Sequence, residues 1–217
     1  MISCCQCCGS EEQFNRAEAA RKLREYRRGA AARTTQLLLD ALMRELVAGQ
    51  TVLDSGGGVG AILRALLKAD AAAATDVNAS AAYLAAVREE VARQGHAGRI
   101  TYHHRNFVDI ADTLAPADIV TLDRVICCYD DMPALVGLSA ARAQRLYGVV
   151  YPRDTWWIRL FMRAQNIIMH VTRAPMRFFV HPTAAVEAAI RAQGLERRFY
   201  RVAGPWQVII YARLQPR

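Results

Sequence analysis

Hydrophobic and polar residues recur along the chain with two different periods, which predicts both helices and strands. Two amphipathic helices are expected first, over residues 11–28 and 37–46. From residue 51 onward, short apolar runs alternate with helical patterns. Strands are expected at 51–54, 71–76, 99–104, 117–122 and 147–151, and helices at 61–67, 79–94 and 133–146. Such alternation favours a parallel sheet with helices on both faces.

The last part of the chain has a different pattern. A helix is expected over residues 182–192. Two strand-like runs follow, 196–202 and 206–214, and the short Gly-Pro turn between them predicts an antiparallel hairpin. The expected fold is therefore a three-layer α/β sandwich in which parallel strands are followed by an edge hairpin.

A glycine-rich turn lies between the first expected strand and its helix, in the sequence Val52-Leu53-Asp54-Ser55-Gly56-Gly57-Gly58-Val59-Gly60-Ala61. Glycines let the backbone approach a ligand, and the helix start offers unpaired N–H groups. Gly56, Gly58 and Ala61 match the dinucleotide fingerprint, with Asp76 twenty residues beyond Gly56. The long segment before the first strand and the lack of a Tyr-x-x-x-Lys motif argue against an NAD-dependent oxidoreductase, which stays the alternative enzyme class.

The longer pattern Asp54-x-Gly56-x-Gly58-x-Gly60 resembles the first motif of the class I, Rossmann-like, S-adenosylmethionine-dependent methyltransferases. The resemblance extends over residues 35–213. It implies a seven-stranded, mostly parallel sheet in the order 3-2-1-4-5-7-6, with strand 7 antiparallel and helices at the N-terminus. It also implies S-adenosyl-L-methionine as the cofactor and methyl transfer to a small-molecule acceptor.

Further cofactor contacts are implied by the same resemblance. Asp76 and Val77 match the second motif, where a carboxylate at the end of strand two accepts both ribose hydroxyls. Asn106 and Phe107 match the adenine position, where the family often carries Asp, so Asn106 departs mildly from it. Helix capping by Asp76 and core packing by Phe107 are the alternative roles.

The fourth motif matches the segment that ends in Asp123 and Arg124, which implies that both lie near the methionine end of the cofactor or near the substrate. Ligands bind at the carboxyl ends of strands in open parallel sheets, which is consistent with this position. An ordinary strand-end aspartate is the alternative.

Within this class, Phe14-Asn15-Arg16, Gly29, Thr35 and residues 150–156 are distantly similar to magnesium-protoporphyrin O-methyltransferases. In that branch an N-terminal segment closes over the cofactor. The similarity implies two regions: a Cys-rich segment and helix (1–34) that covers the site with Tyr26 and Arg28, and a Rossmann-like domain (35–217). The His-Tyr pair of those enzymes is missing near Cys127 and Cys128, so a porphyrin acceptor is not implied.

Composition and charge narrow the class of protein. With 53% hydrophobic and 22% charged residues, the chain is neither disordered nor a coiled coil. No apolar run suits a membrane span and the N-terminus lacks a secretory signal, so an unanchored, cytoplasmic monomer or homodimer is expected. The net charge is +8, and residues 141–217 contain 13 basic and 3 acidic side chains. This excess of Arg reflects genome composition or an anionic substrate; nucleic acid is not expected, because no RNA-binding signature is present.

The chemistry needs an aligned nucleophile about 3 Å from the methyl group and needs a base only if that nucleophile is protonated. Tyr129, His170 and His181 are candidate bases, although each more commonly has a structural role. Cys127 and Cys128 are candidates for holding a thiophilic acceptor such as trivalent arsenic. The spacing within Cys4, Cys5, Cys7 and Cys8 is too close for an ordinary zinc site, so no metal is expected. A non-catalytic thiol- or metal-binding protein is the third hypothesis.

Residues 153–181 are expected to cover the substrate. Apolar residues, among them Trp156 and Phe161, are interleaved there with five arginines. This pattern suits a flat or acidic organic acceptor beneath an apolar surface with a cationic rim. An amphipathic helix packed on the sheet is the alternative.

Overall fold

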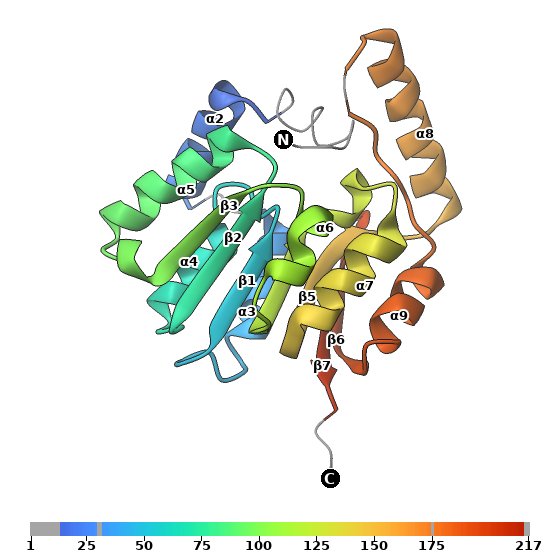
Figure 1. The fold of residues 1–217 in the computed structure, drawn as a ribbon. Helices are drawn as coiled ribbons and strands as arrows, with labels where there is room; N and C mark the ends of the chain where they lie inside the picture. The colour runs from blue at the N-terminus through green and yellow to red at the C-terminus, as the bar shows by residue number, and fades with distance from the viewer. Residues whose placement is uncertain (1–13, 30–31, 175, 215–217) are drawn as a thin grey trace.

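A seven-stranded sheet forms the centre of the molecule, in the strand order β3-β2-β1-β4-β5-β7-β6. The computed structural model describes residues 14–29, 32–174 and 176–214 (Figure 1). The strands are β1 (Thr51–Ser55), β2 (Ala73–Asn78), β3 (Ile100–His104), β4 (Ala117–Asp123), β5 (Ala143–Pro152), β6 (Leu195–Ala203) and β7 (Trp206–Arg213). Strands β1 to β5 pair in parallel, whereas β7 is antiparallel to both β5 and β6. The predicted fold and strand order are confirmed.

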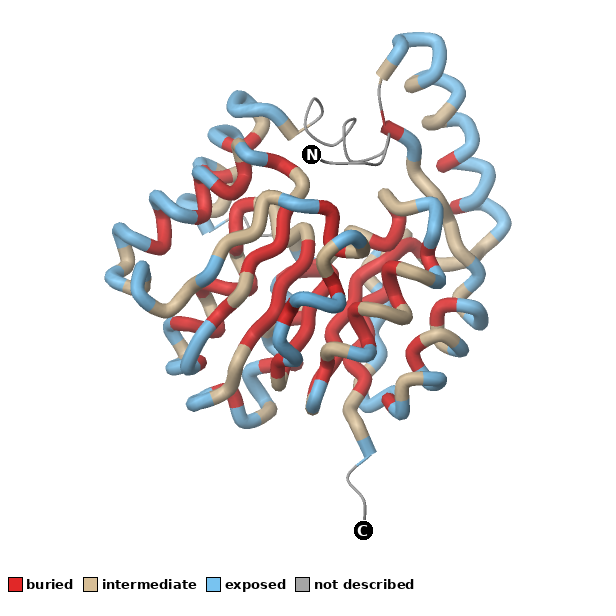
Figure 2. The backbone as a smooth tube through the Cα atoms, in the orientation of Figure 1, coloured by how far each residue is buried: buried red, intermediate tan, exposed pale blue. Residues whose placement is uncertain are grey.

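Helices cover both faces of the sheet. They are α2 (Arg16–Arg27), α3 (Arg33–Leu42), α4 (Ala61–Lys68), α5 (Ala81–Arg93), α6 (Phe107–Ile110), α7 (Met132–Arg142), α8 (Trp156–Val171) and α9 (Thr183–Arg191). Consecutive strand residues enter opposite cores: Val52 packs with α3 and α4, whereas Leu53 packs with α6, α7 and α9. This alternation buries the central strands on both sides, which explains their nearly continuous apolar runs (Figure 2).

Two expectations about helices are corrected. The helix expected over residues 133–146 ends at Arg142, because Ala143 already pairs with Ala117 of β4 and Leu146 pairs with Ala212 of β7. Residues 153–181 contain α8, but this helix buries only Ile158 and Met162, so it is not a helix packed flat on the sheet. None of the helices within the described ranges is long and apolar enough to cross a bilayer.

Candidate functional site

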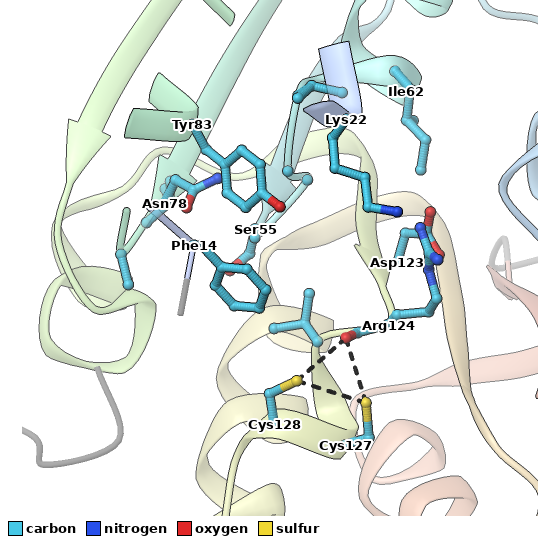
Figure 3. A pocket seen from close by; sticks show the side chains of 18 of the residues that line it. Phe14, Lys22, Ser55, Ile62, Asn78, Tyr83, Asp123, Arg124, Cys127 and Cys128 are labelled. Atoms are coloured by element: carbon cyan, nitrogen blue, oxygen red, sulfur yellow. Dashed lines mark hydrogen bonds and ion pairs between the residues drawn. The ribbon is translucent and has the colours of Figure 1, made fainter. Parts of the chain in front are cut away.

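A cavity of about 570 Å³ opens at the carboxyl ends of β1, β2 and β4. This is the switch point of the sheet, where β2 lies on one side of β1 and β4 on the other, the usual place for a ligand in an open parallel sheet. Its size is within the range of cofactor and small-molecule sites. Several residues proposed from the sequence line it together: Tyr26, Gly56, Gly58, Val77, Asn106, Phe107, Asp123, Arg124, Cys127, Cys128 and Tyr129 (Figure 3).

The glycine turn forms the floor of the cavity and has little room for side chains. Gly56 and Gly58 have φ of 68° and 58°, a left-handed conformation that favours glycine. A Cβ on Gly57 would lie 1.8 Å from Oδ2 of Asp54, whereas a Cβ on Gly58 would meet nothing within 4 Å. The turn is therefore closed toward the protein and open toward the cavity at Gly58. Gly60 is the left-handed N-cap of α4 and is not itself a lining residue.

Two buried carboxylates lie behind this turn on neighbouring strands. Asp54 and Asp76 are paired in the register of β1 and β2, and they are 0% and 1% exposed. Asp54 accepts a hydrogen bond from Thr121 Oγ1 at 2.6 Å, and burial raises its pKa to about 7. Burial, and then the charge of Asp54, raise the pKa of Asp76 well above the ordinary value.

Asp76 has a second unusual property: neither of its carboxylate oxygens has a hydrogen-bond partner within the described part of the chain. Leaving a buried polar group unpaired is costly. Asp54 and Asp76 do not line the cavity themselves, but their chain neighbours Ser55, Val77 and Asn78 do. Asp76 is therefore next in the chain to lining residues, although its own side chain is not part of the lining.

The end of β4 contributes a second acidic group. Asp123 accepts hydrogen bonds from Thr35 Oγ1 at 2.5 Å and from Arg124 Nε at 3.2 Å. Arg124 has φ of 61°, an unusual conformation for a residue with a side chain, and strain of this kind is concentrated at functional sites. Its backbone N–H donates to Val150 O at 2.9 Å, which holds the strained turn on β5.

Asn106 and Tyr129 form one unit on the cavity wall. The Tyr129 hydroxyl lies 3.1 Å from Nδ2 and 3.2 Å from Oδ1 of Asn106, whose amide also donates to Asp109 at 3.0 Å. Phe107 begins α6 next to them and is 3% exposed, so it belongs to the core as well as to the wall. The two readings of Phe107 from the sequence are therefore compatible.

Helix α2 lies over one side of the cavity. Its residues Glu18, Lys22, Glu25 and Tyr26 line the cavity, together with Phe14. Ser80 Oγ donates to the Phe14 carbonyl at 2.7 Å, and the Phe14 and Tyr83 rings lie 5.4 Å apart. Arg28 caps the end of the helix, is exposed and does not line the cavity.

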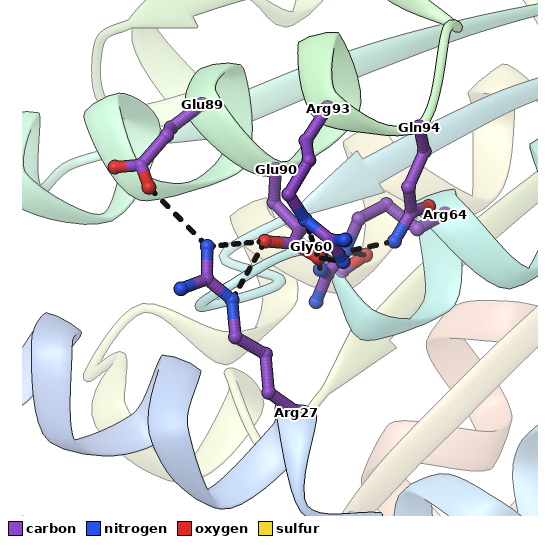
Figure 4. Close-up of polar contacts among 7 residues, drawn as sticks. All are labelled: Arg27, Gly60, Arg64, Glu89, Glu90, Arg93 and Gln94. Carbon is purple, nitrogen blue, oxygen red and sulfur yellow. Dashed lines mark hydrogen bonds and ion pairs between the residues drawn. The ribbon is translucent and has the colours of Figure 1, made fainter.

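An ionic cluster holds α2 in this position (Figure 4). Glu90 of α5 is fully buried and is paired with Arg27 of α2, Arg64 of α4 and Arg93 of its own helix. Hydrogen bonds, first from Arg93, lower the pKa of Glu90 to about 2. Arg64 also donates to the Gly60 carbonyl at 3.1 Å and lies 3.9 Å from the centre of the Tyr26 ring. The cluster therefore connects α2 to the end of the glycine turn.

Two thiols line the cavity just after the end of β4. The sulfurs of Cys127 and Cys128 are 3.7 Å apart, and both point toward the Arg124 carbonyl (Figure 3). The Cys128 hydrogen bond and burial raise the pKa of Cys127 well above the ordinary value. No group of three metal-binding side chains occurs among the described residues, and Cys4, Cys5, Cys7 and Cys8 lie outside them.

The candidate histidines do not reach the cavity. His181 Nε2 lies 2.8 Å from the Tyr129 carbonyl, which gives it a supporting position behind the wall. His170 is in the last turn of α8. No histidine lines the cavity within the part of the chain that the structure describes. Of the three candidate bases, Tyr129 is the one that lines the cavity.

Comparisons with known proteins give structural matches only. No protein-family model and no curated protein matches the sequence. The magnesium protoporphyrin IX methyltransferase of Synechocystis PCC 6803, solved with bound SAH, is 16% identical with a TM-score of 0.68, over 83% of this chain and 82% of that one. An O-methyltransferase family protein from Burkholderia thailandensis is 20% identical with a TM-score of 0.68, over 94% of this chain and 62% of that one.

This chain has the fold of the class I S-adenosylmethionine-dependent methyltransferases. An O-methyltransferase family 2 protein from Planctomyces limnophilus DSM 3776, in complex with apigenin, is a further match, with a TM-score of 0.67 and 14% identity, over 92% of this chain and 62% of that one. The chain therefore spans less than two thirds of the length of these two larger neighbours.

In this methyltransferase fold, several lining residues were not identified from the sequence as site residues. Lys22, Tyr83, Met176 and Phe178 all line the cavity. Lys22 is on the helix expected to cover the cofactor, but only Tyr26 and Arg28 were proposed from it, and Tyr83 is on a helix with no predicted role in the site. Met176 and Phe178 follow α8 without regular structure, and Phe178 is fixed because its backbone exchanges two hydrogen bonds with the Asn166 side chain. Both fall within residues 153–181, which were expected to cover the substrate, but no local pattern singled out these two residues.

Proposed function

We propose that this protein is a methyltransferase that uses S-adenosyl-L-methionine and acts on a small molecule. The observation that carries the proposal is the orphaned, fully buried carboxylate of Asp76 beside a glycine turn that is open to the cavity only at Gly58. The ribose of this cofactor offers two hydroxyl donors, which match the two unpartnered oxygens. The fold and the names of its structural neighbours support the same cofactor.

The residues present fit this cofactor. We assign the glycine turn, against which Asp54 packs, to the ribose and methionine portions of the cofactor. Asp76 accepts the ribose hydroxyls, and Val77, Asn106 and Phe107 surround the adenine. Asp123, Arg124 and Tyr26 hold the methionine end. Bound S-adenosylmethionine supplies a methyl group on a cationic sulfur, which is already a good leaving group.

The protein then has to orient the acceptor and exclude water. Helix α2 excludes water from one side, since it is fixed to α5 by the Glu90 cluster. Tyr129 lines the cavity, where its hydroxyl can hydrogen-bond the acceptor, with Asn106 orienting that hydroxyl. The covering segment 1–34 proposed from the sequence has this role through its helix α2.

An acidic aromatic acceptor is favoured by the lining of the cavity. Phe14, Tyr83 and Phe178 present aromatic rings. Three cations also line the cavity, Lys22, Arg105 and Arg124, of which Lys22 is paired with Glu25 and Arg124 with Asp123. This combination suits a planar molecule with a carboxylate or phenolate. The lining is therefore consistent with the aromatic acceptor proposed from the sequence.

A metalloid held by thiols is the second candidate, and the close pair of Cys127 and Cys128 favours it. The raised pKa of Cys127 opposes it, because thiolates are the metal-binding form. Arsenite titration of the wild type, Cys127→Ser and Cys128→Ser distinguishes the two acceptors: thiol capture predicts that both substitutions abolish binding, and an aromatic acceptor predicts no arsenite binding at all.

The cofactor proposal is tested by calorimetric titration with S-adenosylhomocysteine and, in parallel, NAD. The wild type should bind S-adenosylhomocysteine and not NAD. Asp76→Ala should weaken this binding about 10- to 100-fold, because it removes two hydrogen bonds that contribute roughly 0.5–1.5 kcal/mol each. Asp112→Ala is the matched control, since Asp112 is exposed and paired with Arg142 away from the cavity. Binding of NAD alone would contradict the proposal. So would equal affinities of Asp76→Ala and Asp112→Ala for S-adenosylhomocysteine.

A further inference from the structure

Helix α8 has an apolar side that the described parts of the chain leave uncovered. Seven large apolar side chains of this one helix are at least 43% exposed: Trp156, Trp157, Leu160, Phe161, Ile167, Ile168 and Val171. At 3.6 residues per turn they occupy one continuous arc of roughly 140°. Scattered surface hydrophobics are ordinary, but a contiguous apolar surface usually marks an interaction site. We call this surface the α8 apolar face.

The helix has two other sides, one buried against the protein and one basic. Ile158 and Met162 form the buried seam that holds it on the protein. Between the seam and the apolar face lies a basic edge made of Arg159, Arg163 and His170. The helix contains no Asp or Glu, and the neighbouring Asp154 is already paired with Arg159. The α8 apolar face is thus bordered by positive charge without compensating acids on the same helix.

Charge decides which occupant fits this surface. Residues 141–217 as a whole carry 13 basic and 3 acidic side chains. If two copies of the chain paired through α8, two basic edges would be brought together with no acid between them except Asp154. An anionic surface is favoured instead. Tryptophan is typical of the boundary between lipid and water, and two tryptophans open this helix.

We propose that α8 docks the protein on the surface of an anionic lipid bilayer. An interfacial helix lies in the plane of the membrane, with its apolar side in the boundary between headgroups and acyl chains and its Lys or Arg residues at the headgroups. The α8 apolar face and the basic edge provide these two parts. Figure 1 shows α8 standing out from the sheet, at the same end of the molecule as α2, and no other helix of the described residues covers its outer side.

Docking of this kind is tested by co-sedimentation with vesicles of phosphatidylcholine alone and of phosphatidylcholine with phosphatidylglycerol. The wild-type protein should bind the anionic vesicles, and this binding should weaken with added salt. The double variant Trp156→Ser, Phe161→Ser should reduce partitioning about tenfold or more, because binding scales with buried apolar area. Arg159→Gln with Arg163→Gln should remove the preference for anionic lipid.

The control is the double variant Tyr200→Ser, Val202→Ser, which removes two exposed apolar side chains from β6 instead. It should bind like the wild type. If the α8 variant were poorly folded, quenching of wild-type tryptophan fluorescence by brominated lipid would still report insertion of the apolar face.

Three results would overturn the proposal. The first is a lack of binding to anionic vesicles, and the second is equal binding to neutral ones. The third is a dimer in sedimentation equilibrium that the α8 variant dissociates, because a second copy would then be the occupant. None of these results depends on the cofactor or on methyl transfer.

Discussion

Helices α2 and α8 are both amphipathic and both lie at the cavity end of the sheet, yet the protein uses them in opposite ways (Figure 1). Helix α2 packs Leu23 against Val59 and Tyr83, and it is tied to α5 through Arg27. Helix α8 presents most of its large apolar residues to solvent. Amphipathic sequence therefore predicts that a helix has an apolar side, but it does not predict what covers that side.

The difference between the two helices follows from their charged partners. The charges of α2 meet a buried acid on another helix, so its position is specified by electrostatics as well as by packing. The ion pair of α8 is local and exposed, between Arg159 and Asp154. We therefore expect substitutions on α2 to destabilise the fold, and equivalent substitutions on α8 to leave it almost unchanged.

Breaking the ionic connection of each helix should give the largest contrast. Glu90→Gln leaves Arg64 buried without its counter-charge, and loss of one partner from a buried ion pair costs about 3 kcal/mol or more. Asp154→Asn removes the partner of an exposed arginine and should cost less than about 0.5 kcal/mol. Urea unfolding of both variants measures the difference, and similar losses would show that the Glu90 cluster does not hold α2.

The pH dependence of the stability lost in Glu90→Gln separates the effect of its charge from that of packing. The pKa of Glu90 is lowered from 4.5 to about 2, so its ionic stabilisation is complete above pH 4.5 and is lost as the pH falls through 2. The stability difference between wild type and Glu90→Gln should therefore shrink between these pH values. A difference that stays constant down to pH 2 would assign the effect of the substitution to packing.

Shortening one leucine on each helix should have an intermediate effect. Leu23 is 6% exposed and Leu160 is 59% exposed. Leu23→Ala should lower the free energy of unfolding by about 2 kcal/mol, since it removes buried apolar atoms and leaves a cavity. Leu160→Ala should stay within about 0.5 kcal/mol of the wild type. Thermal unfolding tests this pair, and a large loss in Leu160→Ala would mean that α8 is covered in solution.

The smallest contrast concerns the starts of the helices. Asn15 accepts N–H hydrogen bonds from Ala17 and Glu18, so Asn15→Ala should cost about 1 kcal/mol. Thr155 makes no such bond at the start of α8, and Thr155→Ala should be nearly neutral. Denaturant unfolding of both variants, checked by circular dichroism, should preserve this order; the reverse order would contradict the assigned caps.

The sequence predicted the sheet because its signals are local. The glycine turn, the strand-end Asp76 and the Gly-Pro hairpin are each recognised from a few neighbouring residues, and the resemblance to a known fold ordered the strands. The boundary at Ala143 was missed because it depends on pairing with distant β4 and β7. Sheet pairing overrode the helical pattern there.

The candidate site was predicted less completely than the fold. The strand-end residues Asp123 and Asn106 line the cavity as expected, whereas Asp76 is buried behind its wall. Lys22 and Phe178 lie in the two segments that were expected to cover the site, but which of their side chains reach the cavity depends on tertiary packing. Such contacts leave no periodicity or spacing that a single sequence can reveal.

The most direct test of the account is a crystal structure of the protein with S-adenosylhomocysteine. We predict that both ribose hydroxyls donate to the Asp76 carboxylate, with the adenine between Val77 and Phe107 and the homocysteine end near Asp123. A nucleoside bound elsewhere, or an Asp76 carboxylate that still has no partner when the ligand is bound, would contradict the account.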